Sequence, residues 1–335
     1  MNNNRNLIKD KVDIRENLIK KLDPELLLIL LTDRTREYAK EHKIIESTWK
    51  TSHIIWATDN YEKRWNWYMF SDWMNIDKIT WKIEWYIIKP RITKSAEEQR
   101  KRSEEKAEVF TPAWICNKQN NSVDERRFWK KNIFNKEKED KKWIVNKNKI
   151  IFPDKEWKDR KSYVKDLRLE ISCWEAPYMV SRYDATTWEV LNVNDRIWFL
   201  DRKIRVINEN AVDDNERLEQ VILAFKSSYW YEWQWDSLLI ARENLLRSFI
   251  DYYYFRFNKN PNLKLLKKIA KIISWNIRQM DWLTWLVPTK KKYIETLFWP
   301  QPISEWEEIE CIITDRDHPN KKITFNSLLE NEHHK

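Results

Sequence analysis

The chain has 335 residues and contains 22 tryptophans but no glycine. Glycine adopts positive φ angles without steric cost, so tight turns and loops that closely approach a ligand normally depend on it. At a usual glycine content of roughly 7%, about 23 glycines would be expected in a chain of this length. The 22 tryptophans nearly equal the roughly 23 glycines that are missing. Any fold of this chain therefore has to place bulky residues where small ones are normally needed.

Many of the tryptophans lie in segments that resemble turns or loops, where glycine would be expected, and we single out Trp65, Trp67, Trp188, Trp230 and Trp282. We therefore hypothesise that UGA codons meaning glycine were translated as tryptophan. Codons of UGG at Trp174, Trp188 and Trp282 would refute this hypothesis. Other tryptophans lie in apolar helix or strand contexts and are interpreted as true tryptophans, namely Trp114, Trp233, Trp275 and Trp306.

Composition favours a soluble cytoplasmic protein. Hydrophobic residues make up 42% of the chain and charged residues 34%, which supports a core and a soluble surface. The longest apolar run, Leu26–Leu31, is far shorter than the roughly 18 residues of a membrane span, and the N-terminus lacks a signal-peptide core. Cys116, Cys173 and Cys311 are too few and too scattered for a disulfide framework or a zinc site.

The net charge of +9 and the isoelectric point near 9.1 favour a polyanionic partner such as DNA. An AT-rich genome is an equally good explanation, because it enriches Lys, Asn and Ile whatever the function. Charge alone therefore does not establish nucleic-acid binding.

Hydrophobic patterning predicts three parts: a helical and loop-rich N-terminal extension over 1–100, an α/β domain over 101–300 and a tail over 301–335. A Lys-rich insertion is predicted over about 125–165. Asp23-Pro24 is typical of a helix start, and a helix is predicted over Leu26–Tyr38. A charged, solvated helix is predicted over 94–108, and another helix after Pro112.

Short apolar segments alternate with amphipathic helices between residues 167 and 287. Strands are predicted at Leu169–Ile171, Tyr229–Glu232 and Trp275–Met280, and a strand or strand flank over Arg196–Val206. Helices are predicted over 210–225, 236–252 and 263–273. This alternation favours a parallel sheet covered by helices.

An acidic residue lies at or just after the end of three of these predicted strands: Glu170, Glu232 and Asp281. The carboxyl ends of neighbouring parallel strands line one crevice, where nucleotide-like cofactors bind. A tight loop after the first strand lets backbone approach a cofactor, while acids can accept hydrogen bonds from ribose hydroxyls and an adenine amine. Strand-terminal acids are common, so the ordered set carries the prediction and no single acid does.

These segments resemble the adenine-specific DNA methyltransferases, in particular the methyltransferase subunits of restriction-modification systems. Phe110-Thr111-Pro112 is similar to their Phe-Thr-Pro motif. Residues 170–178 are similar to their Asp-Pro-Ala-Cys-Gly-x-Gly-x-Phe loop, with Trp174 and Ala176 in place of the two glycines. Residues 231–245 resemble an acid followed by Leu-Ala-Arg-x-Asn-Leu-Leu, and 280–283 resemble Gly-Asp-x-Leu. The resemblance covers roughly residues 100–290.

The resemblance implies a Rossmann-like fold that uses S-adenosylmethionine to methylate DNA, at the adenine amino group, in a restriction-modification system. It implies DNA and a restriction or specificity subunit as partners, and no membrane. The cofactor-binding residues that it implies are Phe110, Thr111, Pro112, Glu170, Cys173, Trp174, Glu175, Ala176, Glu232 and Asp281.

The chain departs from this family at one place. Those enzymes carry an Asn/Asp-Pro-Pro-aromatic tetrapeptide that grips the flipped base, and neither Asn260-Pro261-Asn262 nor residues 299–302 match it. Catalytic residues therefore stay unassigned. The alternative is a non-catalytic cofactor- or DNA-binding subunit of a restriction-modification complex. A nuclease site at Asp159 and Glu170 is disfavoured, because their spacing lacks an Asp…Glu-x-Lys pattern.

Overall fold

The computed structural model describes residues 19, 22–43, 51–58, 69–80, 94–106, 111–153, 159–171, 178–180, 182–184, 189–289, 291–294, 301–306, 308–315 and 321–327. Three parallel strands, β3 (Arg168–Ile171), β4 (Ser228–Glu232) and β5 (Ile277–Gln279), form a sheet in that order. All three lie where the sequence predicts strands. The chain is therefore a mixed α/β protein with a small parallel sheet.

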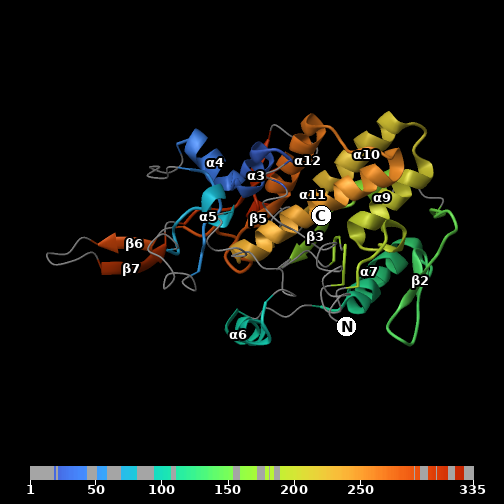
Figure 1. Ribbon diagram of the computed structural model, residues 1–335, viewed down its shortest axis with the longest axis horizontal. Coiled ribbons are helices and arrows are strands. Elements are labelled where there is room, and N and C mark those ends of the chain that lie inside the picture. The colour runs from blue at the N-terminus through green and yellow to red at the C-terminus, as the bar shows by residue number, and fades with distance from the viewer. Residues whose placement is uncertain are drawn as a thin grey trace.

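Paired helices connect these strands (Figure 1). Between β3 and β4 lie α9 (Phe199–Asn210) and α10 (Asp214–Lys226), and between β4 and β5 lie α11 (Trp235–Phe257) and α12 (Leu263–Asn276). The strand predicted over Arg196–Val206 is wrong, because α9 begins there. Leu200, Ile204 and Ile207 are buried at helical spacing, so the apolar pattern has a period near 3.6 and not 2.

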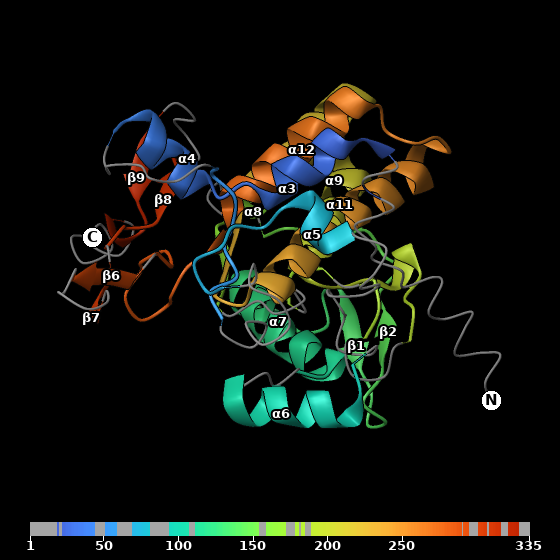
Figure 2. The same cartoon turned by 60° about the vertical axis from the view of Figure 1, so that its left-hand side comes forward.

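The two faces of the sheet pack against different parts of the chain. Trp230 of β4 and Ile277 of β5 belong to the main core, which the connecting helices share. Tyr231 belongs to a second cluster with residues of the C-terminal hairpin, β8 (Ile312–Thr314) and β9 (Lys322–Thr324). Figure 2 shows this hairpin beside α4 (Arg34–Glu41), away from α9 and α11.

The N-terminal helices join the main core. In α3 (Pro24–Leu31), Asp23 caps the first turn by accepting a 2.8 Å hydrogen bond from Glu25 N, as Asp23-Pro24 predicts. The single helix predicted over Leu26–Tyr38 is instead two helices, because Asp33 caps a new one at Arg34. The buried leucines of α3 lie in one cluster with Leu266, Ile269 and Ile273 of α12.

Several shorter elements surround this core. They are α5 (Ile76–Thr80), α6 (Ala96–Lys106), α7 (Ala113–Phe128), β1 (Asn135–Glu137), β2 (Trp143–Val145), α8 (Arg160–Lys165), the 3₁₀ turn η3 (Val193–Asp195), β6 (Lys291–Ile294) and β7 (Gln301–Trp306). The antiparallel pair β1–β2 lies in the segment predicted as an insertion. Among the described helices, none has the length and apolarity needed to cross a membrane.

Candidate functional site

The carboxyl edge of the sheet brings the predicted acids to neighbouring strands. Glu170 is the third residue of β3 and pairs in register with Trp230, while Glu232 ends β4 opposite Gln279. Just past β5, Met280 N donates a 3.3 Å hydrogen bond to the backbone oxygen of Glu232. Asp281 follows directly. The order of acids that the sequence predicts is therefore an order in space along one edge.

Glu170 is enclosed by the protein. Its side chain is 6% exposed, and its two oxygens accept hydrogen bonds from Trp230 Nε1 at 2.8 Å and from Tyr178 N at 3.1 Å. Burial raises the pKa of Glu170 to about 8, and the nearby charge of Glu232 raises it further while the hydrogen bonds oppose the rise. Glu170 thus links β3, β4 and the segment at Tyr178, and burial favours its protonated form.

Glu232 is also buried, with 3% of its surface exposed. Its Oε1 accepts a 2.9 Å hydrogen bond from Gln234 N, which fixes the carboxylate at the point where β4 ends and α11 is about to begin. A fixed acid at this position is the group that the sequence assigns to ribose hydroxyls.

Asp281 holds the turn after β5. Its Oδ1 accepts a 2.8 Å hydrogen bond from Leu283 N, and its backbone oxygen accepts one from Trp285 N at 2.9 Å. Trp282, in the same turn, is 49% exposed. The indole of Trp282 therefore lies partly in solvent and does not fill the interior of the protein.

The start of α7 lies next to this edge. Tyr178 hydrogen-bonds Thr111 through its side chain, and Cys116 Sγ donates to Thr111 O at 3.7 Å. Burial raises the pKa of the Cys116 thiol, and the charge of Glu170 adds to the rise, so this helix lies close to β3. Tyr178 thus connects Thr111, just before α7, with Glu170 of β3.

One amide at this helix start is already occupied. Ala113 N donates a 3.3 Å hydrogen bond to Asp184 Oδ2, so a carboxylate of the chain itself takes this helix N-terminal amide, a kind of group that can bind anions. The predicted cofactor residues Phe110, Cys173, Trp174, Glu175 and Ala176 lie outside the described residues.

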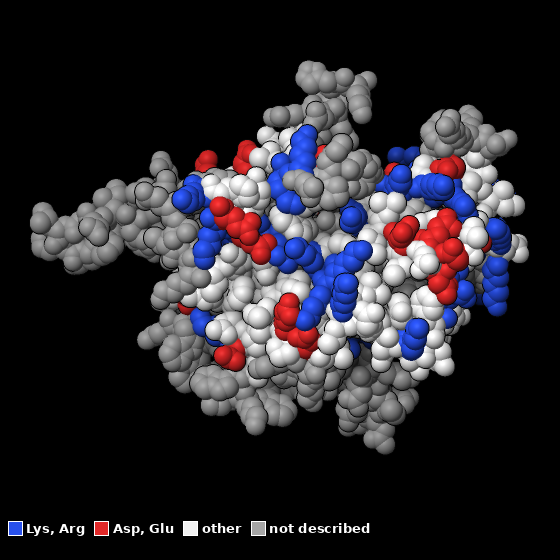
Figure 3. Space-filling view, turned by 90° about the horizontal axis from the view of Figure 1, so that it is seen from above, with Lys and Arg blue, Asp and Glu red and all other residues white. Residues whose placement is uncertain are grey.

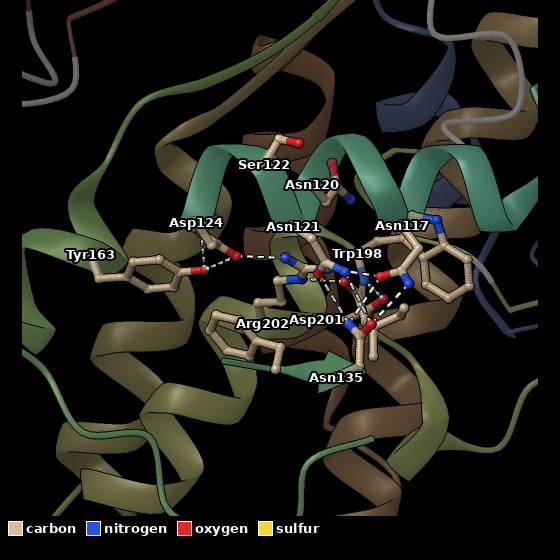
Figure 4. Close-up of polar contacts among 12 residues, drawn as sticks. Asn117, Asn120, Asn121, Ser122, Asp124, Asn135, Tyr163, Trp198, Asp201 and Arg202 are labelled. Atoms are coloured by element: carbon tan, nitrogen blue, oxygen red, sulfur yellow. Dashed lines mark hydrogen bonds and ion pairs between the residues drawn. The ribbon is translucent and has the colours of Figure 1, made fainter. Parts of the chain in front are cut away.

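A buried polar network, which the sequence analysis missed, fixes α7 to α9 (Figure 4). Arg202 Nη1 forms a 2.6 Å ion pair with Asp124, and its Nη2 donates to Asn117 at 3.0 Å and to Asn121 at 2.8 Å. Asn135 of β1 bonds to both asparagines as well. The spacing of Asn117, Asn121 and Asp124 places a polar stripe on one face of a helix, which was the available signal.

Tyr163 extends this network by donating from its hydroxyl to Asp124 Oδ1 at 3.1 Å. Every member is buried and pairs within the network, so the cluster stabilises the packing of α7 and leaves no group directed at a ligand. Within the described part of the chain, no group of three or more His, Cys, Asp or Glu residues could hold a metal ion.

No protein-family model, curated protein or solved structure matches this chain. The family resemblance therefore rests on the motifs and on the positions that the fold gives them.

Proposed function

We propose that the chain is an S-adenosylmethionine-dependent DNA methyltransferase of a restriction-modification system, with the adenine amino group as its target. One observation carries the proposal: Glu170, Glu232 and Asp281 follow one another along the carboxyl edge of a parallel sheet, beside the start of α7. A Rossmann-like fold with more strands than the described three is part of the same proposal.

The residues at this edge fit such a cofactor in their chemistry. A buried carboxylate at the end of β4 suits two ribose hydroxyls, because it accepts hydrogen bonds from neutral donors without needing a counter-charge. Glu232 would take this role, with Gln234 N keeping its carboxylate in place. The sulfonium cofactor, when bound, supplies the methyl group.

Glu170 has a different role in this proposal. Since its carboxyl already accepts from Trp230 and from the backbone at Tyr178, it shapes the first loop and does not contact the ligand. Asp281 lies at the end of the next strand, where its free lone pairs suit an adenine amine.

Calorimetric titration with S-adenosylmethionine tests the proposal. Glu232→Ala should weaken binding roughly tenfold to a hundredfold, because a lost hydrogen bond to a charged group costs roughly 1.5–3 kcal/mol. The matched control is Glu219→Ala on the exposed side of α10, which should bind as the parent does. Equal affinities in folded Glu232→Ala and parent protein would remove Glu232 from the site.

The rival function is a non-catalytic subunit, which the missing Asn/Asp-Pro-Pro-aromatic tetrapeptide favours. Transfer of a radiolabelled methyl group to DNA separates the two functions. Cofactor binding without transfer by the isolated chain favours the subunit. In either case, DNA affinity should fall steeply as salt rises, because the chain carries a net charge of +9.

A further inference from the structure

A cavity of about 510 Å³ lies at the other edge of the sheet, where the strands begin. Tyr229 at the start of β4 and Asn276 just before β5 line it, together with residues of α12, α4 and the β8–β9 hairpin. The predicted cofactor acids end or follow the strands, so this cavity is a separate site. Its volume is typical of pockets that bind small ligands.

One wall of the cavity is basic. Lys268 and Lys271 of α12 line it with Lys226 from the end of α10, and no described carboxylate lies within ion-pair distance of these three ammonium groups. Helix α12 carries no acidic residue at all. Three lysines that converge without acidic partners favour an anion in the space between them.

A fourth lysine approaches from the hairpin. The Lys322 ammonium lies 4.1 Å from the ring centroid of Trp275, and both residues line the cavity. Burial lowers the pKa of Lys322, the charges of Lys271 and Arg34 lower it further, and the charge of Glu37 opposes the shift. An anion bound there would relieve this repulsion.

A buried cation lies behind the aromatic lining. Arg278 of β5 is 4% exposed, and its guanidinium carbon lies 5.6 Å from the ring centroid of Tyr229. Its guanidinium interacts with the buried thiol of Cys311, which opposes the lowering of the pKa of Arg278 by burial. A buried charge is screened weakly by solvent, so Arg278 adds to the positive potential at the cavity.

The wall formed by α4 and the residue after β8 is acidic, although the charge of Glu37 also acts on Lys322 of β9. Glu37 and Glu41 of α4 line it, with Asp315 after β8, and Glu37 is held by Arg34 at 2.6 Å. Seen from above, basic side chains gather over the middle of the molecule, with acidic ones beside them (Figure 3). A ligand that fits both walls carries an anion at one end and hydrogen-bond donors at the other.

We propose that this cavity binds a nucleotide, with its phosphate against Lys268 and Lys271 and its hydroxyl or amino donors toward Glu41. The rings of Tyr229 and Trp275 give the lining an aromatic character that suits a base. The nucleotide is either free or the phosphorylated end of a nucleic-acid strand, since both carry the same chemical groups.

The test is calorimetric titration of the full chain with AMP, inorganic phosphate and adenosine. AMP should bind more tightly than either fragment, because only AMP reaches both walls. Lys268→Ser/Lys271→Ser should weaken AMP binding at least roughly tenfold, since two charged contacts to phosphate are lost. The matched control, Lys130→Ser/Lys131→Ser, removes the same charge from exposed positions after α7 and should bind AMP as the parent does.

Failure to bind AMP more tightly than inorganic phosphate would overturn the proposal, and so would an equal loss of affinity in the two double variants. A 5′-phosphorylated oligonucleotide and the same oligonucleotide with a 5′-hydroxyl then distinguish the sources. Preference for the phosphorylated strand over AMP assigns a strand end, and preference for AMP assigns a free nucleotide. S-adenosylmethionine affinity should be unchanged in Lys268→Ser/Lys271→Ser, so this result stands apart from the cofactor proposal.

Discussion

Trp230 and Glu170 lie opposite each other on β4 and β3, and the indole Nε1 of Trp230 donates a 2.8 Å hydrogen bond to Glu170 Oε2. Both side chains are buried, so neither group has water as a substitute partner. This bond connects the two strands at the edge where the cofactor site is proposed. It also gives Trp230 a role that glycine could not fill in this structure.

Trp230→Phe should destabilise the protein by about 1–3 kcal/mol, because it keeps the aromatic ring but leaves a buried carboxyl without one donor. Urea unfolding at neutral pH measures the change. Trp143→Phe is the control, because the Trp143 indole makes only a 3.5 Å bond to Asp195 O near the surface. Equal losses in the two variants would show that the Trp230–Glu170 bond contributes little.

Glu170 should make stability fall as the pH rises from 4.5 to about 8. Its pKa is raised to about 8 by burial, whereas the unfolded chain has the ordinary value of 4.5. The folded state therefore holds this proton longer, so its contribution is complete below pH 4.5 and is lost as the pH rises through about 8. Burial also raises the pKa of Asp201, from its ordinary value of 3.8 to about 7. The stabilising contribution of Asp201 is therefore also lost as the pH rises through this range.

Glu170→Gln removes the first of these two contributions. Its free energy of unfolding should fall less between pH 6 and pH 9 than that of the parent, at roughly neutral cost in packing because Gln is nearly isosteric. Urea titrations at several pH values measure the slope. Parallel slopes in the variant and the parent would show that Glu170 keeps an ordinary pKa in the folded protein.

Asp236 should act at the acidic end. It is 1% exposed at the start of α11 and pairs with Arg102 of α6 at 2.7 Å and with Lys94 at 3.6 Å. Burial alone raises the pKa of Asp236, but these two charges outweigh burial and lower it to about 2. Its stabilising contribution is present above the ordinary value of 3.8 and is lost as the pH falls through about 2.

Arg102→Met should therefore cost about 3–5 kcal/mol at neutral pH, because it leaves a buried carboxylate with Lys94 at 3.6 Å and the backbone donor Ser237 N in place of its closest charged partner. The loss should shrink as Asp236 becomes protonated in acid. Arg100→Met, two residues earlier at an exposed position of α6, is the control and should change stability by less than about 0.5 kcal/mol. A cost that does not depend on pH would mean that Arg102 acts through packing alone.

The positions of the parallel strands could be predicted from the sequence because each is a short segment that alternates with amphipathic helices and has an acid near its carboxyl end. The helix α9 was predicted incorrectly. Its segment mixes Lys203 and Arg205 with apolar residues, and short runs of this kind fit both the period of 2 of a strand and the period of 3.6 of a helix. Lys203 is buried and donates to Ser227 Oγ at 2.8 Å, a contact that only the folded chain creates.

The candidate site was predictable in part. The order of Glu170, Glu232 and Asp281 follows from parallel topology, which sequence rhythm indicates. That Glu170 would be enclosed by Trp230 depends on strand register, and local patterning does not fix register. The basic cavity could not be predicted either, because its lysines come from α10, α12 and β9, and only the folded chain brings these elements together.

Backbone geometry gives the codon hypothesis a direct test at two tryptophans. Trp129 ends α7 with φ 52° and ψ 30°, and Trp285 has φ 61°. Left-handed backbone is the usual conformation of the glycine that follows a helix. Trp282 is absent from the described residues with positive φ, although it lies in a turn. Trp129 and Trp285 are therefore better candidates for recoded glycine than Trp282.

Trp129→Gly should stabilise the protein by about 0.5–1 kcal/mol. The left-handed conformation costs residues other than glycine about 1–2 kcal/mol, and the variant removes this cost. The greater conformational entropy of glycine in the unfolded chain offsets part of the stabilisation. Trp129 is 61% exposed, so its replacement removes little packing. The control, Trp282→Gly, should destabilise by about 0.5–1 kcal/mol because glycine adds chain entropy there without relieving a positive φ. Thermal unfolding of the two variants should thus shift in opposite directions. The gene should read UGA at Trp129 and Trp285 and UGG at Trp230, and UGG at all three positions would leave the left-handed tryptophans as authentic, strained residues.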